Sequence, residues 1–394
     1  MADHLMNTYK PLPIRFTHGK GAYLYDDSGQ AYLDALSGIA VCGLGHAHPA
    51  ITQAICDQAE LLLHTSNLYS IEPQSALADS LCSIAQLQRA FFCNSGAEAN
   101  EAAIKLARLY GHQNAIDTPQ IIVTEGSFHG RTMATLSATG NRKIQAGFEP
   151  LVPGFLRVPY DDLDAIRTIA ANRPDVVAIL VEPITGEGGI RVPGDNYLPE
   201  LRTLCDDNNW LLMLDEIQTG MARTGRWFAH QHYPVKPDVM TLAKGLGNGV
   251  PIGACLADGK AADVFQPGSH GSTFGGNPLA TRAAIEVINV IKEQQLDKRA
   301  AQLGDRMKEA FSSRLSHLDG VVAIRGKGLM IGIELQTPCA ALVTQALDKG
   351  LLINVTADSV VRLLPPLIIS DDEAHRIIDL TCELIINFLS GDPS

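Results

Sequence analysis

Short apolar runs alternate with stretches of helical periodicity through the middle of the chain, and this alternation is the strongest constraint on the fold. The apolar runs occupy residues 90–93, 120–123, 155–158, 176–181, 210–214 and 239–243. Helical stretches such as 97–110, 163–171 and 197–208 separate several of them. Strands that alternate with helices are typical of a mostly parallel sheet, so the sequence predicts an α/β fold with helices on both faces of the sheet.

A further apolar run, residues 252–257, begins soon after residue 243. A parallel connection needs roughly a dozen residues or more for its crossover, and the segment between these two runs is too short for one. We therefore expect the last strand of a seven-stranded sheet to run antiparallel to the others.

The two ends of the chain differ from the middle. Residues 15–36 alternate apolar and polar side chains around Asp26-Asp27-Ser28-Gly29, which predicts a hairpin. The last part predicts helices at 277–291 and 296–315, short strands at 321–326 and 330–334, and a final helix from about residue 371. We expect three parts: an N-terminal segment (1–60) that contributes to a small domain, a large domain (61–276) and a C-terminal small domain (277–394).

Charge and composition exclude some classes of partner. The chain has 31 basic and 43 acidic residues, and its formal net charge of −12 disfavours nucleic acid and anionic membranes. No run of 18 apolar residues predicts a membrane span, and the first ten residues do not resemble a secretory signal. Neither the eight cysteines nor the twelve histidines cluster at metal-ligand spacing. We therefore expect buried free thiols, no metal site and a cytoplasmic protein.

A lysine and an acid follow two of the predicted strands. Lys244 lies between the run 239–243 and a glycine-rich turn, and Asp215 follows the run 210–214. Taken singly, the lysine could be a solvated loop end and the acid a helix cap. Because open α/β sheets bind ligands at the carboxyl ends of their strands, the two side chains could also serve one ligand.

Two helix starts carry residues that suit an anion. Ser95 and Gly96 follow a strand and open a helix, where free N–H groups and the helix dipole favour phosphate. The alternative is a capped helix without a ligand, with Ser95 as N-cap and Glu98 completing a capping box. Ser272 and Thr273 also precede a helix, and a simple cap explains them equally well.

Three other segments place aromatic or charged side chains at strand ends or inside a strand. Phe128, which follows a strand, could stack on a flat ring, and Arg131 could pair with a carboxylate. Glu182 and Glu187 lie on a loop rich in glycine and proline, where a solvated turn is the alternative. Arg362 stands alone in an apolar strand, which favours an anionic partner or a ligand.

The motifs together point to one ligand. Phosphate donors, an aromatic face, acids and a lysine all fall at the carboxyl ends of strands in one predicted sheet. Pyridoxal 5'-phosphate needs each of them, including a lysine amine for its aldehyde and a carboxylate for its pyridine nitrogen. From about Tyr9 to beyond Pro366, these motifs and their order resemble the class III aminotransferases, pyridoxal-phosphate enzymes of fold type I.

The resemblance implies a role for each cofactor residue. Lys244 would bond to the cofactor and carry the catalytic proton, and Asp215 would pair with the pyridine nitrogen. The other cofactor residues that the resemblance implies are Ser95, Gly96 and Ala97 at the phosphate, Phe128 and Ile217 on the two ring faces, Gln218 near the phenolic oxygen, and Glu182. Thr273 would reach the phosphate from a second subunit, which implies a homodimer with shared active sites.

The resemblance also implies a substrate set. Arg131 would bind the α-carboxylate of an acylated donor, with Ser272 in the same substrate site, and Arg362 would bind a carboxylate of glutamate or 2-oxoglutarate. Glu187 would pair with Arg362 while the long donor is bound and move away for the dicarboxylate. We state this switch as a hypothesis.

One segment resembles a particular subgroup of this family. Residues 33–41, followed by Gly45-His46-Ala47-His48-Pro49, are similar to the subgroup that acts on N2-acetyl-L-ornithine, and Ile39 stands where ornithine-specific members usually carry tyrosine. This implies transfer of the δ-amino group to 2-oxoglutarate, a step of arginine biosynthesis that gives N-acetyl-L-glutamate 5-semialdehyde and L-glutamate. The sequence leaves open succinylornithine, ornithine, 4-aminobutyrate or succinyl-diaminopimelate as donor, a glutamate-1-semialdehyde-type aminomutase, or a silent cofactor-binding protein.

Overall fold

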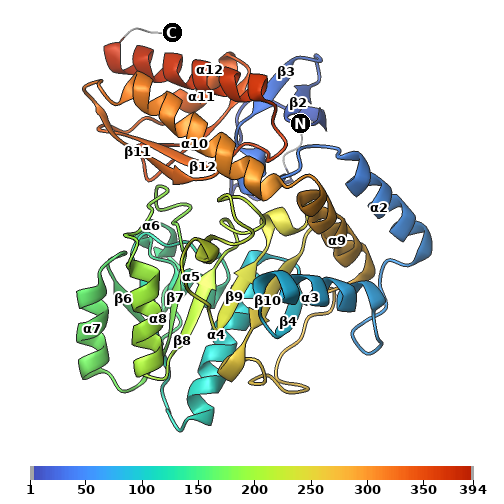
Figure 1. The fold of residues 1–394 in the computed structure, drawn as a ribbon, viewed down its shortest axis with the longest axis vertical. Helices are drawn as coiled ribbons and strands as arrows, with labels where there is room; N and C mark the ends of the chain where they lie inside the picture. The colour runs from blue at the N-terminus through green and yellow to red at the C-terminus, as the bar shows by residue number, and fades with distance from the viewer. Residues whose placement is uncertain (1–3, 392–394) are drawn as a thin grey trace.

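A seven-stranded sheet occupies the lower part of the view in Figure 1 of the computed structural model, which describes residues 4–391. The strand order is β4-β10-β9-β8-β7-β5-β6. The strands are β4 (Arg89–Cys93), β5 (Gln120–Thr124), β6 (Phe155–Val158), β7 (Val176–Val181), β8 (Leu211–Asp215), β9 (Val239–Leu242) and β10 (Gly253–Ala257). Only β10 runs antiparallel to its neighbours in this sheet. The predicted mostly parallel sheet with an antiparallel last strand is confirmed.

The strands of this sheet are mostly apolar because helices cover both faces. On β5, Ile121 and Val123 pack into one buried cluster with α4, while Ile122 packs into another with α7 and α8. All three side chains are fully buried. The helices of this part are α3 (Glu72–Ala85), α4 (Gly96–Gln113), α5 (Met133–Ala138), α6 (Arg142–Gln145), α7 (Leu163–Asn172) and α8 (Tyr197–Asp207). The period of two along the strand therefore divides the core into two layers.

Two four-stranded sheets lie outside the large sheet. One has the order β1-β2-β3-β13 and the other β11-β12-β15-β14. Their strands are β1 (Phe16–Lys20), β2 (Tyr23–Asp26), β3 (Ala31–Asp34), β11 (Val321–Lys327), β12 (Met330–Leu335), β13 (Leu351–Leu352), β14 (Asn354–Thr356) and β15 (Val360–Leu363). Because β13 pairs with β3, the beginning and the end of the chain share a sheet. The domain boundaries given above stay predictions.

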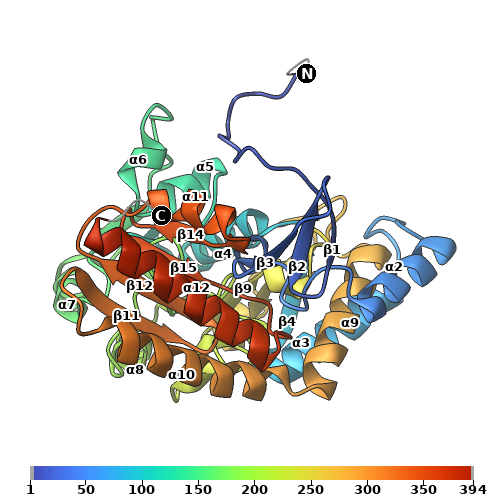
Figure 2. The same cartoon turned by 90° about the horizontal axis from the view of Figure 1, so that it is seen from above.

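The remaining helices surround these smaller sheets and join them to the large one. They are α1 (Ser37–Ala40), α2 (Pro49–Leu61), α9 (Pro278–Glu293), α10 (Leu296–Leu315), α11 (Ala341–Asp348) and α12 (Asp371–Ser390), with 3-10 turns at Ala229–His232, Lys244–Leu246 and Gly259–Ala261. Seen from above, α10 and α12 lie side by side over the sheet that contains β11 and β12 (Figure 2). The segment before β1 extends away from the body of the molecule (Figure 2).

The expectation of buried free thiols is correct only in part. None of the eight is in a disulfide, and Cys93, Cys205, Cys255, Cys339 and Cys382 are buried, but Cys42 and Cys82 are half-buried and Cys56 is exposed. Between residues 4 and 391, no helix is long and apolar enough to cross a membrane. That same part of the chain has no group of three or more His, Cys, Asp or Glu side chains that could hold a metal ion.

We expect Gly304→Ala to destabilise the protein. A β-carbon on Gly304 of α10 would lie 2.0 Å from the backbone oxygen of Gly328, in the tight hairpin between β11 and β12. Alanine gains about 1 kcal/mol in helix propensity, but overpacking against backbone costs typically 1–3 kcal/mol. Urea unfolding should show a lower midpoint for this variant. Ser312→Ala, at an exposed position of the same helix, is the control. Equal midpoints for both variants would contradict the close contact between Gly304 and Gly328.

Candidate active site

A cavity of about 380 Å³ opens at the carboxyl ends of β4, β5, β7, β8 and β9. Most of the residues that the sequence singled out line it: Ser95, Gly96, Ala97, Phe128, Arg131, Glu182, Glu187, Asp215, Ile217, Gln218 and Lys244. Parallel strands bring these residues together because their carboxyl ends meet at one edge of the sheet.

The start of α4 forms one wall of the cavity. Ser95 caps the helix, with its hydroxyl accepting the N–H of Glu98 at 3.2 Å. The expected capping box is only half present, because the Glu98 carboxylate accepts the N–H of Asn94 at 2.6 Å rather than that of Ser95. A β-carbon on Gly96 would lie 2.8 Å from the Ile217 side chain, so only glycine lets these two segments approach this closely. The helix N-terminus therefore faces the cavity with its first turn uncovered.

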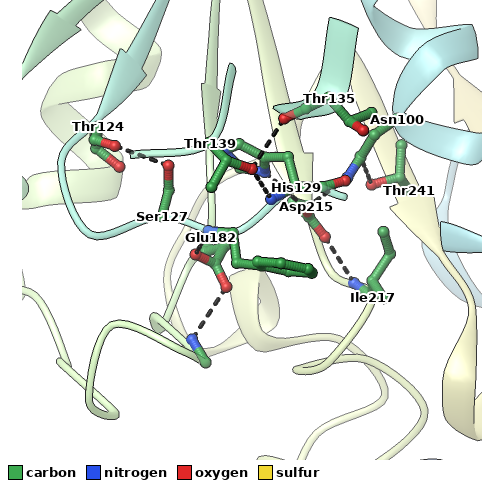
Figure 3. Close-up of polar contacts among 12 residues, drawn as sticks. Asn100, Thr124, Ser127, His129, Thr135, Thr139, Glu182, Asp215, Ile217 and Thr241 are labelled. Atoms are coloured by element: carbon green, nitrogen blue, oxygen red, sulfur yellow. Dashed lines mark hydrogen bonds and ion pairs between the residues drawn. The ribbon is translucent and has the colours of Figure 1, made fainter. Parts of the chain in front are cut away.

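Asp215 is held by three N–H donors (Figure 3). Its side chain is buried, and Oδ2 accepts from His129 Nδ1 at 2.8 Å and from Asn100 Nδ2 at 2.7 Å. Oδ1 accepts from the backbone N–H of Ile217 at 3.1 Å. The Thr241 hydroxyl donates to Asn100 Oδ1 at 2.7 Å, which fixes the orientation of the amide. These three donors satisfy the hydrogen-bonding capacity of a carboxylate that is out of contact with solvent.

Glu182 joins two loops of the site. Its Oε2 accepts the N–H of Phe128 at 3.1 Å, and its Oε1 accepts the N–H of Gly186 at 3.0 Å (Figure 3). Burial raises the pKa of the Glu182 carboxyl to about 7. The loop of Phe128 also carries Arg131, whose guanidinium carbon lies 5.7 Å from the centre of the Phe128 ring. Glu182 thus positions the aromatic side chain and the loop that leads to Glu187.

Lys244 begins a 3-10 turn directly beyond β9. Its backbone has a φ of 45°, in the left-handed region that is uncommon for residues other than glycine. Burial and the positive charge of Arg362 lower the pKa of its amine. A lowered pKa increases the fraction of neutral, nucleophilic amine, which suits bond formation with an aldehyde.

Arg362 reaches the site from β15 in one of the smaller sheets. Its side chain is fully buried and pairs with Glu187, with Nη1 to Oε1 at 2.7 Å. Nε donates to Asn354 Oδ1 at 3.0 Å. Nη2 is buried and has no hydrogen-bond partner within residues 4–391. A buried guanidinium with a free N–H donor beside a displaceable carboxylate can accept a second carboxylate.

Ser272 and Thr273 do not line the cavity of their own chain. Ser272 Oγ accepts from Asn94 Nδ2 at 3.2 Å and from the N–H of Gly275 at 3.0 Å, while Thr273 is exposed in the loop before α9. The role of Thr273 in a second subunit stays a prediction. Sequence reasoning did not assign a role to His129, Asn100 or Thr241, although His129 directly follows the aromatic residue that it did select.

The chemistry of the cavity fits pyridoxal phosphate. Asp215 offers a buried carboxylate for a protonated ring nitrogen, Lys244 an amine for the aldehyde, and Phe128 an aromatic surface. The first turn of α4 offers N–H groups to a phosphate, and Gly96 has no side chain that would block them. A Rossmann-type dinucleotide site would instead need a glycine-rich turn that opens a helix, and the turn after Lys244 opens none.

Comparison with known proteins agrees with this site. The sequence model described as aminotransferase class-III matches residues 5–385, and the chain belongs to that family. A protein of Nitrosomonas europaea named acetylornithine aminotransferase is 60% identical over 99% of both chains. The acetylornithine aminotransferase of Methanothermobacter thermautotrophicus is 46% identical over 97% of this chain and 96% of its own.

Solved structures have the same fold. Ornithine aminotransferase from Toxoplasma gondii has a TM-score of 0.95 at 34% identity, covering 98% of this chain and 94% of its own. Another structure of the Toxoplasma enzyme is described as having partial occupancy of pyridoxal phosphate at its active site. Acetylornithine aminotransferase from Elizabethkingia anophelis has a TM-score of 0.87 at 33% identity, covering 98% and 96%. The fold is therefore that of pyridoxal-phosphate aminotransferases.

Proposed function

We propose that this aminotransferase binds pyridoxal 5'-phosphate and transfers the δ-amino group of N2-acetyl-L-ornithine to 2-oxoglutarate. The products are N-acetyl-L-glutamate 5-semialdehyde and L-glutamate. Full-length relatives named acetylornithine aminotransferase, up to 60% identical, support the donor. The observation that carries the proposal is the ion pair of the buried Arg362 with Glu187 at 2.7 Å, because Glu187 lines the same cavity as Arg131.

Each protein group contributes a separate part of the reaction. When bound, pyridoxal phosphate supplies an aldehyde that accepts the amino group and a ring that withdraws electrons. Lys244 moves the proton at the reacting carbon of the substrate, for which a lowered amine pKa is suitable. Asp215 holds a positive charge on the ring nitrogen, and the apolar strands beneath it exclude water.

Two arginines distinguish the substrates. The donor reacts at its terminal amine, so its α-carboxylate lies far from the ring, where the exposed Arg131 can bind it. Glutamate reacts at its α-amine, which places a carboxylate near Arg362. While Glu187 neutralises Arg362, the uncharged chain of the acylated donor can pass; when Glu187 moves away, Arg362 binds the dicarboxylate.

Free ornithine is the second candidate donor, because several similar structures are ornithine aminotransferases. Ile39 favours the acylated donor, since ornithine-specific members usually carry tyrosine there. Ile39 is partly exposed and two residues from Val41, which lines the cavity.

A half-reaction tests the proposal. The holoenzyme is mixed with N2-acetylornithine without a keto acid, and the visible absorption of the bound cofactor is followed. Loss of the resting band, restored by 2-oxoglutarate, is the expected result. An unchanged band with this donor, but a change with ornithine, succinylornithine, 4-aminobutyrate or succinyl-diaminopimelate, would replace the substrate and keep the reaction class. Repeated turnover without 2-oxoglutarate, to a product that keeps its amino group, would indicate an aminomutase.

Glu187→Gln should change the preference between the two substrates. The amide cannot neutralise Arg362, so the free cation should favour the dicarboxylate and disfavour the long donor. We expect kcat/KM for N2-acetylornithine to fall by about 10-fold or more relative to that for glutamate. Both half-reactions are measured by single-turnover kinetics. The control is Glu125→Gln, an exposed acid near the end of β5. An unchanged ratio in Glu187→Gln would rule out the switch.

The proposal also covers the assembly, the location and the pathway of the enzyme. We propose a homodimer with shared active sites, a cytoplasmic location and a place in arginine biosynthesis, with no nucleic acid or membrane as partner. The net charge of −12 supports the absence of polyanionic partners. Sedimentation of the holoenzyme tests the dimer, and cofactor loss from a Thr273→Ala variant would support a phosphate contact supplied by the second subunit.

A further inference from the structure

Arg223 is a buried cation in the loop after β8, and only 3% of its surface is exposed. It forms no ion pair with any carboxylate of residues 4–391. We propose that Arg223 binds a monatomic anion such as chloride in a small cavity beside the turn that begins at Lys244. The inference does not depend on the proposed function, because this cavity shares no lining residue with the larger one.

The hydrogen bonds of Arg223 leave part of its guanidinium without a partner. Nη1 donates to the backbone oxygens of Leu329 at 3.0 Å and of Pro365 at 2.5 Å, and both acceptors are neutral. Within residues 4–391, Nε and Nη2 make no hydrogen bond. Buried donors are rarely left unpaired, so the free N–H groups of Nε and Nη2 indicate a ligand that only accepts hydrogen bonds.

The charge of Arg223 is also not compensated by the carboxylate that acts on it. That carboxylate belongs to Asp34, which already pairs with His46 at 2.8 Å and accepts two backbone N–H groups. Hydrogen bonds with Asp34 and Cys42 raise the pKa of His46 to about 9, so a charged imidazole neutralises Asp34 at neutral pH. Burial lowers the pKa of Arg223 to about 9, and its guanidinium stays charged at neutral pH. A buried charge without a counterion is costly, and an anion would remove this cost.

The cavity beside Arg223 restricts the size and the kind of ligand. Its volume is about 10 Å³, which is room for one particle of about the size of a water molecule. Apart from Arg223, the lining residues are glycine or apolar: Ala40, Gly43, Leu44, Gly220, Met221, Gly245, Val287, Ile291 and Leu367. A water molecule would find no side-chain acceptor there for its own O–H groups. Chloride needs none and is only slightly larger than water, whereas sulfate and phosphate are too large.

Thermal unfolding of the holoenzyme tests for the site. Potassium chloride replaces potassium gluconate at constant ionic strength, because gluconate is far too large for this cavity. We expect Tm to rise by about 1–2 °C in chloride, since an anion that binds only the folded protein stabilises it by mass action. An unchanged Tm would overturn the proposal. Because chloride can also reach the exposed Arg131 in the larger cavity, variants must assign the effect.

Two matched glycine variants assign the effect to the small cavity. A β-carbon on Gly43 would have Leu367 as its nearest neighbour, at 3.8 Å, so the methyl group fits and takes space from the anion. Gly194→Ala is the control, because its β-carbon would lie 3.8 Å from Asp161, outside the cavity. We expect Gly43→Ala to lose the chloride dependence of Tm and Gly194→Ala to keep it. Arg223→Met, which keeps the length of the side chain without its charge, should lose it as well.

Bromide locates the anion directly, because its anomalous scattering identifies it in a crystal. Crystals of the holoenzyme soaked in sodium bromide should show a peak within about 3.5 Å of Arg223 Nε or Nη2, and crystals of Gly43→Ala should lack it. A cavity that holds only water would overturn the proposal. Equal chloride dependence in the wild type and in Gly43→Ala would overturn it too, since the ion would then bind elsewhere. If Arg223→Met does not fold, the glycine variants and the bromide density still decide.

Discussion

Lys244→Ala should reduce turnover by at least about 10⁴-fold, because by our proposal the variant loses both the amine that bonds to the cofactor and the group that moves the substrate proton. No other described lysine lines the cavity to replace it. The lowered pKa of the Lys244 amine, caused by burial and by Arg362, is the physical basis of its reactivity. The measurement is kcat with N2-acetylornithine and 2-oxoglutarate at saturating cofactor.

Cofactor binding should survive in part in Lys244→Ala. The start of α4 and Asp215 remain available to the phosphate and the ring nitrogen, so gel filtration should leave some cofactor on the protein, with an altered absorption band. Lys143→Ala is the control, because Lys143 is exposed and pairs only with the exposed Asp358. Normal turnover by Lys244→Ala would remove this residue from the mechanism.

Asp215→Ala should lose about 10²- to 10³-fold in kcat and bind the cofactor more weakly. A preorganised charge at the site of a developing charge typically contributes that much, and alanine leaves the ring nitrogen without an anion. The donors of His129 and Asn100 would also be left without their acceptor in a buried position. Some of the loss will therefore appear as reduced thermal stability, which must be measured on the same variant.

Asp215→Asn separates charge from shape, and Asp207→Asn controls for the substitution itself. Asparagine is nearly isosteric with aspartate, so a loss of kcat as large as in Asp215→Ala would assign the effect to charge. Asp207 is an exposed acid at the end of α8, and its replacement should leave kcat unchanged. Near-normal kcat in both Asp215 variants would contradict its pairing with the ring nitrogen.

Local patterns predicted the large sheet well. Each apolar run became a strand within one or two residues, and the short connection after β9 correctly predicted that β10 is antiparallel. These features are local, because burial on both faces demands continuous apolar residues and a crossover demands chain length. Helices α2 and α3 and strands β13 and β14 were not predicted. Helices α2 and α3 pack on α9, and β13 pairs with β3, so these partners lie far along the chain.

The residues of the candidate site also divide into those that the sequence could identify and those that only the structure identifies. Residues that stand at strand ends, such as Lys244, Asp215 and Phe128, could be selected from the sequence because the ends of parallel strands must meet. The pairing of Glu187 with Arg362 was expected only from the resemblance, and its 2.7 Å distance depends on β15, which belongs to another sheet. His129 and Asn100 carry no distinguishing local pattern.

The sequence by itself determined the class of fold, the segments that form the strands carrying the site, and the kind of chemistry that their ends can support. It did so because periodicity, turn residues and chain length act over short distances. Only the tertiary structure decided which donors hold Asp215, which group lowers the pKa of Lys244, and which N–H of Arg362 stays free. These contacts join residues up to 175 positions apart, and their geometry follows from packing of the whole chain rather than from any local pattern.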